Sequence, residues 1–155
     1  FLGGRPSPNS YKLEHLLGGG DSDDHPNNRP LNGVDDQLLQ AWVLKAPDSR
    51  AARLARFVGY FEAQNDTFRW TPIALWLLDL RDAGDVGRIF SDRFHVGSWS
   101  GSEESRFVRR LNLTAALVDH HNPSVAAWGR EQHEMLLRII KEIEQRKRAA
   151  NEKFE

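Results

Sequence analysis

Apolar residues recur every three or four positions along most of the chain after residue 33, which is the period of an amphipathic helix. Residues that favour helix starts stand before these runs, including Asp35, Ser102 and the pairs Thr71-Pro72 and Asn122-Pro123. The pattern predicts an all-α domain with six helices and no strand. The helices form three consecutive antiparallel pairs, over residues 35–63, 71–95 and 102–150.

The last pair has the clearest pattern. Phe107 and Leu111 fall on one face of its first helix, and an apolar stripe runs along its second helix from Val125 to Ile143. Between the helices, Asn122-Pro123 combines a capping side chain with a proline at the first helical position. Because the stripe stops at Ile143, we expect the last turns of the second helix to project into solvent.

The centre of the core is predicted in the helix that begins at Ile73, which is apolar on nearly all sides. The polar residues 64–69 before it are interpreted as a connection. Residues 1–33 are rich in Gly, Pro, Asn, Ser and Asp, and we interpret them as an extended linker or arm ahead of a helical domain over residues 34–155. One apolar segment in this arm, residues 11–17, could dock on the domain.

Composition narrows the possible functions. The 155-residue chain has no cysteine, which excludes disulfides, thiolate nucleophiles and Cys-ligated zinc, and this is compatible with a cytoplasmic protein. No apolar run approaches the ~20 residues of a membrane span. The net charge of −1 argues against bulk attraction to nucleic acid or anionic membrane. Since the chain starts at Phe1 rather than at a methionine, we expect it to be a fragment of a longer protein, or a processed or trimmed chain.

The stretch Asp119–Ile140, with Asn122-Pro123 in the turn and later Leu136-Leu137, resembles the inter-helix turn and second helix of a HEAT-type repeat. Residues 47–54 resemble the same pattern more loosely. The resemblance implies a short α-solenoid or an irregular bundle of helical pairs. Residues 94–99 and 154–155 resemble the C-terminal ends of large bacterial proteins with helical-repeat tails, including defence-associated ones. This second resemblance implies a module of a larger bacterial protein.

One string resembles a catalytic motif. Asp119-His120-His121 is similar to the Asp-His-His motif of the DHH phosphoesterases, in which acid and imidazole ligands hold divalent metal and activate water. The resemblance makes these three residues metal-site candidates, with Asp21 or Asp23 as a second cluster. That family has strands leading into its acidic motifs, whereas the residues before Asp119 form an amphipathic helix. The other interpretation places the two histidines at a helix C-terminus, where imidazolium meets the negative end of the dipole.

Candidate binding residues are basic or aromatic. The predicted second helix carries arginines at three-residue spacing, and the last helical pair carries three more; Trp99 lies in a Gly/Ser-rich loop. The full set is Arg50, Arg53, Arg56, Trp99, Arg106, Arg109 and Arg110.

Three hypotheses follow from these residues and motifs. The first is a non-catalytic module without a cofactor that binds a partner protein. The second is a nucleic-acid-binding domain that uses the arginines. The third is the metal-dependent phosphoesterase.

Overall fold

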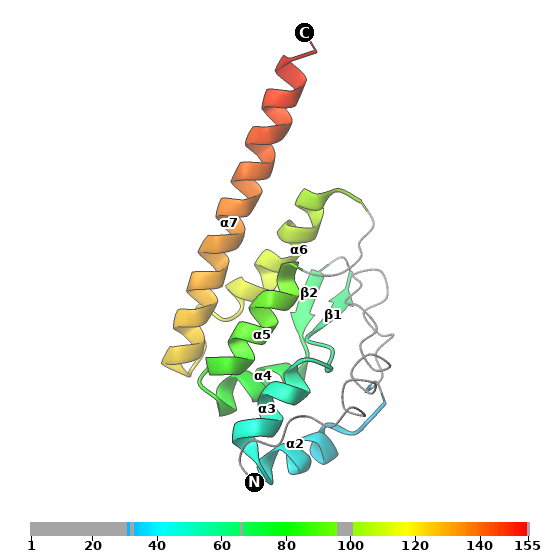
Figure 1. Ribbon diagram of the computed structural model, residues 1–155, viewed down its shortest axis with the longest axis vertical. Coiled ribbons are helices and arrows are strands. Elements are labelled where there is room, and N and C mark those ends of the chain that lie inside the picture. The colour runs from blue at the N-terminus through cyan, green and yellow to red at the C-terminus, as the bar shows by residue number, and fades with distance from the viewer. Residues whose placement is uncertain (1–30, 32, 66, 96–100, 155) are drawn as a thin grey trace, which may run out of the picture.

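The computed structural model describes residues 31, 33–65, 67–95 and 101–154. This part of the chain is mostly helical, as the sequence predicts, and contains six helices and one two-stranded antiparallel sheet (Figure 1). The elements, labelled as in Figure 1, are α2 (Asp36–Leu44), α3 (Pro47–Ala55), β1 (Phe61–Gln64), β2 (Thr67–Trp70), α4 (Pro72–Leu80), α5 (Gly84–His95), α6 (Glu103–Ala115) and α7 (Pro123–Glu152).

Side-chain caps fix the starts of four helices where the sequence predicts them. Asp35, Thr71 and Ser102 each accept a hydrogen bond from a backbone N–H in the first turn of α2, α4 and α6. Asn122 Oδ1 accepts from the Ser124 N–H at 3.0 Å and caps α7. Each cap satisfies one of the N–H groups that a helix start leaves without an intrahelical partner.

The prediction of a helix to residue 63 and a connection over 64–69 is wrong, because β1 and β2 form a β-hairpin there. In β2, Phe68 and Trp70 are buried while Thr67 and Arg69 are exposed, so the side chains alternate between two faces with the period of a strand. Asn65 has φ of 51°, a left-handed conformation that asparagine tolerates in a two-residue turn. The prediction that the chain has no strand is therefore also wrong.

The main core is centred on aromatic rings from four elements or their flanks. Trp70 of β2 lies 5.7 Å from Phe90 of α5 and 6.2 Å from Trp128 of α7, measured between ring centroids. Trp70 Nε1 also donates to the Leu113 carbonyl of α6 at 2.7 Å, which satisfies the buried indole N–H. Helix α4 contributes Ile73, Ala74, Leu77 and Leu78 to this core.

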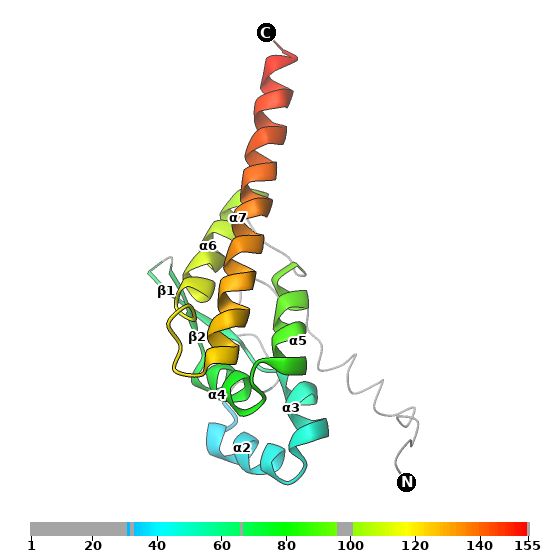
Figure 2. The same ribbon diagram turned by 90° about the vertical axis from the view of Figure 1, so that its left-hand side faces the viewer.

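Helices α6 and α7 run antiparallel along each other and form a helical hairpin (Figures 1 and 2). Where the chain leaves α6, α7 packs so closely against it that a Cβ atom on Gly129 would lie 2.6 Å from Cβ of Leu117, in the turn that follows α6. Farther along, Lys147 of α7 forms an ion pair with Glu104 of α6. A second, smaller apolar cluster joins the two helices between these points and consists of Phe107, Leu136, Ile140 and Ile143, with Leu111 and Ile139 packed against it.

Beyond this cluster α7 is exposed on all sides. Every residue from 144 to 154 is exposed, and both views show this end of the helix projecting past the other elements. The apolar stripe ends at Ile143 as the sequence indicates, so no apolar face holds the last turns against the rest of the molecule.

No helix among the described residues is long and apolar enough to cross a membrane. Several sequence predictions lie outside the described residues: the extended arm with its segment 11–17, the proposed ligands Asp21 and Asp23, and the aromatic Trp99.

Candidate functional site

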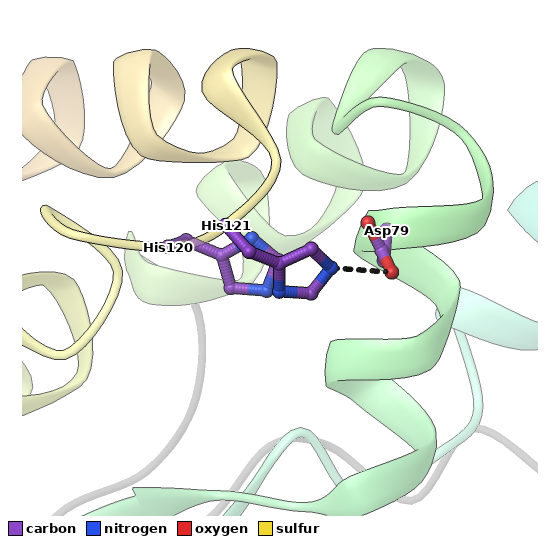
Figure 3. Close-up of side chains that lie close together, drawn as sticks. All are labelled: Asp79, His120 and His121. Carbon is purple, nitrogen blue, oxygen red and sulfur yellow. Dashed lines mark hydrogen bonds and ion pairs between the residues drawn. The ribbon is translucent and has the colours of Figure 1, made fainter.

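The turn between α6 and α7 brings both histidines of the Asp-His-His string toward α4. His120 and His121 lie together with Asp79, near the C-terminal end of α4, and the three side chains each offer a metal-ligand atom within 4.8 Å of the others (Figure 3). Asp119 is exposed and is not part of this cluster, so the structure brings together only two of the three consecutive residues. The acidic member comes from a residue 40 positions earlier, a partner that the linear motif cannot reveal.

The geometry of the cluster is set by three short contacts. His121 Nε2 lies 3.1 Å from Asp79 Oδ2. The rings of His120 and His121 stack with their centroids 4.2 Å apart and an angle of 30° between their planes. His120 Nδ1 accepts a hydrogen bond from the Asn122 N–H at 3.1 Å, which fixes the orientation of this ring.

Asn122 links the turn to both acidic residues at the end of α4. Its Nδ2 group donates to Asp79 Oδ1 at 3.0 Å and to Asp82 Oδ1 at 2.7 Å, while its Oδ1 caps α7 through Ser124. The sequence identifies Asn122 as a helix cap because the cap is local. The two bridges could not be identified in this way, since they depend on how α4 packs against the turn.

The hydrogen bond from Asn122 lowers the pKa of Asp79 below its ordinary value of 3.8, and the hydrogen bond and positive charge of His121 act in the same direction. Partial burial opposes this effect, and the charge of His120 adds a smaller lowering. The Asp79 side chain is 40% exposed and that of His121 is 75% exposed. At neutral pH the cluster therefore presents an ionised carboxylate beside two imidazoles at the surface.

A second feature is a groove of about 770 Å³ between α3 and α5. Arg88 in its wall pairs with Asp85 at 3.1 Å. Arg93 is buried and donates through Nη1 to the Ala55 and Val58 carbonyls at 2.6 and 2.8 Å, which caps the C-terminal end of α3. The groove is lined by Ala52, Arg56, Asp85, Arg88, Ile89, Asp92 and Arg93. A smaller cavity of about 140 Å³ lies between the start of α2 and Ile73, and neither hollow includes the histidine cluster.

The three predicted arginines of the α3 region have different environments. Arg50 is half-buried; its Nη1 donates to the Trp42 carbonyl at 2.9 Å, and its guanidinium lies 4.8 Å from the Trp42 ring centroid. Arg53 and Arg56 are both exposed, but only Arg56 lines the groove. The stripe expected from the three-residue spacing is therefore divided between a cation–π contact and the solvent.

The arginines of α6 are not on an exposed face as the sequence suggests. Arg106 is 4% exposed and Arg110 is 0% exposed, while Arg109 is half-buried. Arg110 Nη1 donates to the Arg106 carbonyl at 3.0 Å. Because the two guanidinium groups are covered, they cannot form the predicted binding surface for phosphates or for a protein.

One exposed apolar feature was missed. Val34, Leu38 and Trp42 follow each other at four-residue spacing along α2 and its approach, and all three are exposed, with Leu38 67% accessible. Helix α2 also carries Leu39 and Val43, and Val43 is its one buried residue. The four-residue spacing of Val34, Leu38 and Trp42 is the sequence signal that indicates this exposed apolar stripe.

Comparisons of the chain with protein-family models, with curated proteins and with solved structures give no match.

Proposed function

We propose that this chain is a non-catalytic protein-interaction module, and that it acts within a larger bacterial protein in the cytoplasm. The observation that carries the proposal is the groove between α3 and α5. Its volume of about 770 Å³ falls within the range of ligand-binding clefts, and it is open to the surface between two packed helices, where part of a partner protein can enter. A protein partner seated there is recognised by shape and charge rather than by chemistry.

The charges of the groove indicate the kind of segment that fits. Ala52 and Ile89 supply an apolar contact surface, while Arg56 and Asp92 are exposed charges of opposite sign. Arg88 is already paired with Asp85. We therefore propose a partner segment with an apolar residue between an acidic side chain for Arg56 and a basic side chain for Asp92.

The charges favour this partner over nucleic acid. Asp85 and Asp92 line the same groove as Arg56, and carboxylates repel phosphate groups. The buried Arg106 and Arg110 add nothing to an exposed basic surface. A phosphoesterase has even less support, since the histidine cluster lies outside both hollows and its acidic member is not Asp119.

The architecture that we propose for the module is a HEAT-like short α-solenoid or an irregular bundle, preceded by an extended N-terminal arm. Contacts between α2 and α3, between α4 and α5, and between α6 and α7 support pairs of neighbouring helices. The β-hairpin is inserted between the first and second pairs, so the repeat is irregular at that point.

The decisive experiment compares two arginines of the α3 region. Proteins captured from the source cell by the wild-type chain are identified by mass spectrometry, and a candidate is purified and titrated against Arg56→Glu and Arg53→Glu. Arg53 is the matched control because it is equally exposed but does not line the groove. We expect Arg56→Glu to weaken binding about tenfold or more, because it places like charge against the partner's acid, and Arg53→Glu to leave it within about twofold.

A partner that binds both variants as tightly as the wild type would overturn the assignment to the groove. Binding of single-stranded DNA or RNA at low salt, with a steep decline as salt rises, would favour the nucleic-acid hypothesis instead.

A further inference from the structure

We propose that Asp79, His120 and His121 bind one divalent transition-metal ion of the zinc class, which fastens the α6–α7 turn to the end of α4. The three ligands come from two segments of the chain, with Asp79 42 positions before His121, and their ligand atoms already lie within 4.8 Å of one another. This inference is independent of the groove between α3 and α5.

The donor set selects the metal. Two imidazole nitrogens and one carboxylate oxygen suit Zn²⁺ and its neighbours Co²⁺ and Ni²⁺. Calcium and magnesium prefer six or more oxygen ligands, and two imidazoles do not supply these. Because the chain has no cysteine, no thiolate competes for the ion. Water completes the coordination in this exposed position, as in zinc sites with three protein ligands.

The distances show how far the side chains must move. Ligand atoms at about 2.0–2.2 Å from a tetrahedral zinc ion are about 3.3–3.5 Å apart. His121 Nε2 and Asp79 Oδ2, at 3.1 Å, are close to this spacing without any movement. The ion takes the place of the proton that these two atoms share. Both groups are partly exposed, so small side-chain rotations meet little packing resistance.

His120 has to change more. Its Nδ1 accepts the Asn122 N–H, so the neutral ring carries its proton on Nε2 and has no free lone pair to offer. Metal binding requires His120 to release this N–H and to turn toward Asp79. The stack of the two rings, with centroids 4.2 Å apart, keeps His120 beside the ligand pair during this change.

Asn122 supports the carboxylate from outside the cluster. Its Nδ2 donates to Asp79 Oδ1 and leaves Oδ2 directed at His121. A hydrogen bond of this kind holds a metal-ligating carboxylate in one orientation. The same Nδ2 group contacts Asp82 Oδ1, whose negative charge lies close to the cluster and favours a bound cation.

The test uses the full chain without a polyhistidine tag and with Zn²⁺ alone as the probe. Isothermal titration in chelator-treated buffer measures affinity and stoichiometry for the wild type, Asp79→Asn, His121→Ala and Asp119→Asn. Asp119→Asn is the matched control, since it removes the acid of the linear motif but not a member of the cluster. Circular dichroism establishes that each variant is folded, and Co²⁺ absorption spectra report the coordination geometry.

We expect one Zn²⁺ per wild-type chain, with affinity reduced about tenfold or more in Asp79→Asn and His121→Ala and unchanged in Asp119→Asn. Zn²⁺ should also raise the melting temperature of the wild type and of Asp119→Asn more than that of Asp79→Asn and His121→Ala, because the ion binds only the folded arrangement. The proposal is overturned if the wild type takes up no Zn²⁺ at millimolar concentration, or if all four proteins bind it equally. Should Asp79→Asn fail to fold, His121→Ala decides, because its exposed ring contributes little to packing.

Discussion

At the scale of single residues, Asn122 and Asp79 connect segments that are far apart in the chain. Asn122 caps α7 with its oxygen and bridges Asp79 and Asp82 with its nitrogen, so one side chain both starts a helix and attaches it to α4. Each hydrogen bond contributes on the order of 1 kcal/mol, and somewhat more where the acceptor is charged. The strength with which the turn is held to α4 therefore depends on whether the Asp79 carboxyl group is ionised.

This dependence predicts a response of stability to pH. The pKa of Asp79 is lowered below 3.8 in the folded chain, first by the Asn122 hydrogen bond and then by His121. Stability gained from the ionised carboxylate is therefore fully present above about pH 4 and is lost as the pH falls through the folded pKa. The free energy of unfolding of the wild type should exceed that of Asp79→Asn at pH 6, by under about 1 kcal/mol because water screens this half-exposed group.

Urea denaturation of both proteins at several pH values between 6 and 3, in metal-free buffer, measures the difference. The difference should shrink with acidification. A difference that stays constant or grows toward pH 3 would show that the Asp79 carboxylate is not stabilised in the folded chain.

The buried arginines show which side-chain environments cannot be predicted from the local sequence. A helical pattern assigns charged residues to the solvent, yet Arg93 and Arg110 are buried. Arg93 is accommodated because it donates to the Ala55 and Val58 carbonyls, on a segment 35 to 38 residues earlier in the chain. Local periodicity carries no information about such distant acceptors, whereas caps such as Ser102 depend only on the next few residues and are predictable.

At the scale of elements, the β-hairpin shows how a competing period was overlooked. The helical period continues loosely from α3 through Val58 and Phe61, and this pattern favours a helix up to residue 63. The alternation of Thr67, Phe68, Arg69 and Trp70, with Asn65 two positions earlier, was the signal for a strand after a tight turn. A strand of four residues has only two positions that point inward, so the alternation of apolar and polar residues extends over very few positions.

The crossing of α6 and α7 depends on a glycine. A Cβ at position 129 would lie 2.6 Å from Leu117 Cβ and 3.2 Å from the Leu117 carbonyl carbon, a distance at which backbone or side chain must shift. Alanine is favoured over glycine within helices by about 1 kcal/mol, while overpacking costs about 1–3 kcal/mol. Because the clash involves backbone, we expect Gly129→Ala to lower the free energy of unfolding by about 1–2 kcal/mol.

Chemical denaturation of Gly129→Ala measures this change, and Ala127→Gly, at an exposed position on the same helix, calibrates the propensity term. Ala127→Gly should cost about 1 kcal/mol. If Gly129→Ala instead stabilises the chain by a similar amount, helix propensity dominates and the close approach of the two helices is not needed for folding.

At the scale of the whole molecule, the apolar interior has two parts. The main core surrounds Trp70 and includes Leu113 of α6 and Leu117 of the following turn, whereas the smaller cluster around Phe107 lies along the outer part of the α6–α7 hairpin. The sequence predicts α6, α7 and the exposed end of α7 well, because those features follow from one continuous stripe. The main core reaches α6 through β2, whose Trp70 donates to the Leu113 carbonyl near the C-terminal end of that helix, while the smaller cluster forms between α6 and α7 alone.

Two parts with few shared residues should unfold separately when one of them is weakened, and truncation of α7 tests this. Ending the chain after Arg148 removes only exposed turns and should change the free energy of unfolding by less than about 0.5 kcal/mol. Ending it after Arg138 removes Ile139, Ile140 and Ile143 and leaves Leu136 and Leu111 from the cluster beside Phe107. The outer half of α6 should then lose amide protection in hydrogen exchange, while the amides of α4 remain protected.

Equal loss of protection in α4 and in α6 would show that the two clusters fold as one cooperative unit. The separate behaviour is expected because the aromatic contacts of the main core join β2, α5 and the first turns of α7, all of which the shorter chain retains. The hydrogen bond between Thr114 and His133 also remains in that chain, so the inner half of the helical hairpin keeps its polar link when the outer half is lost.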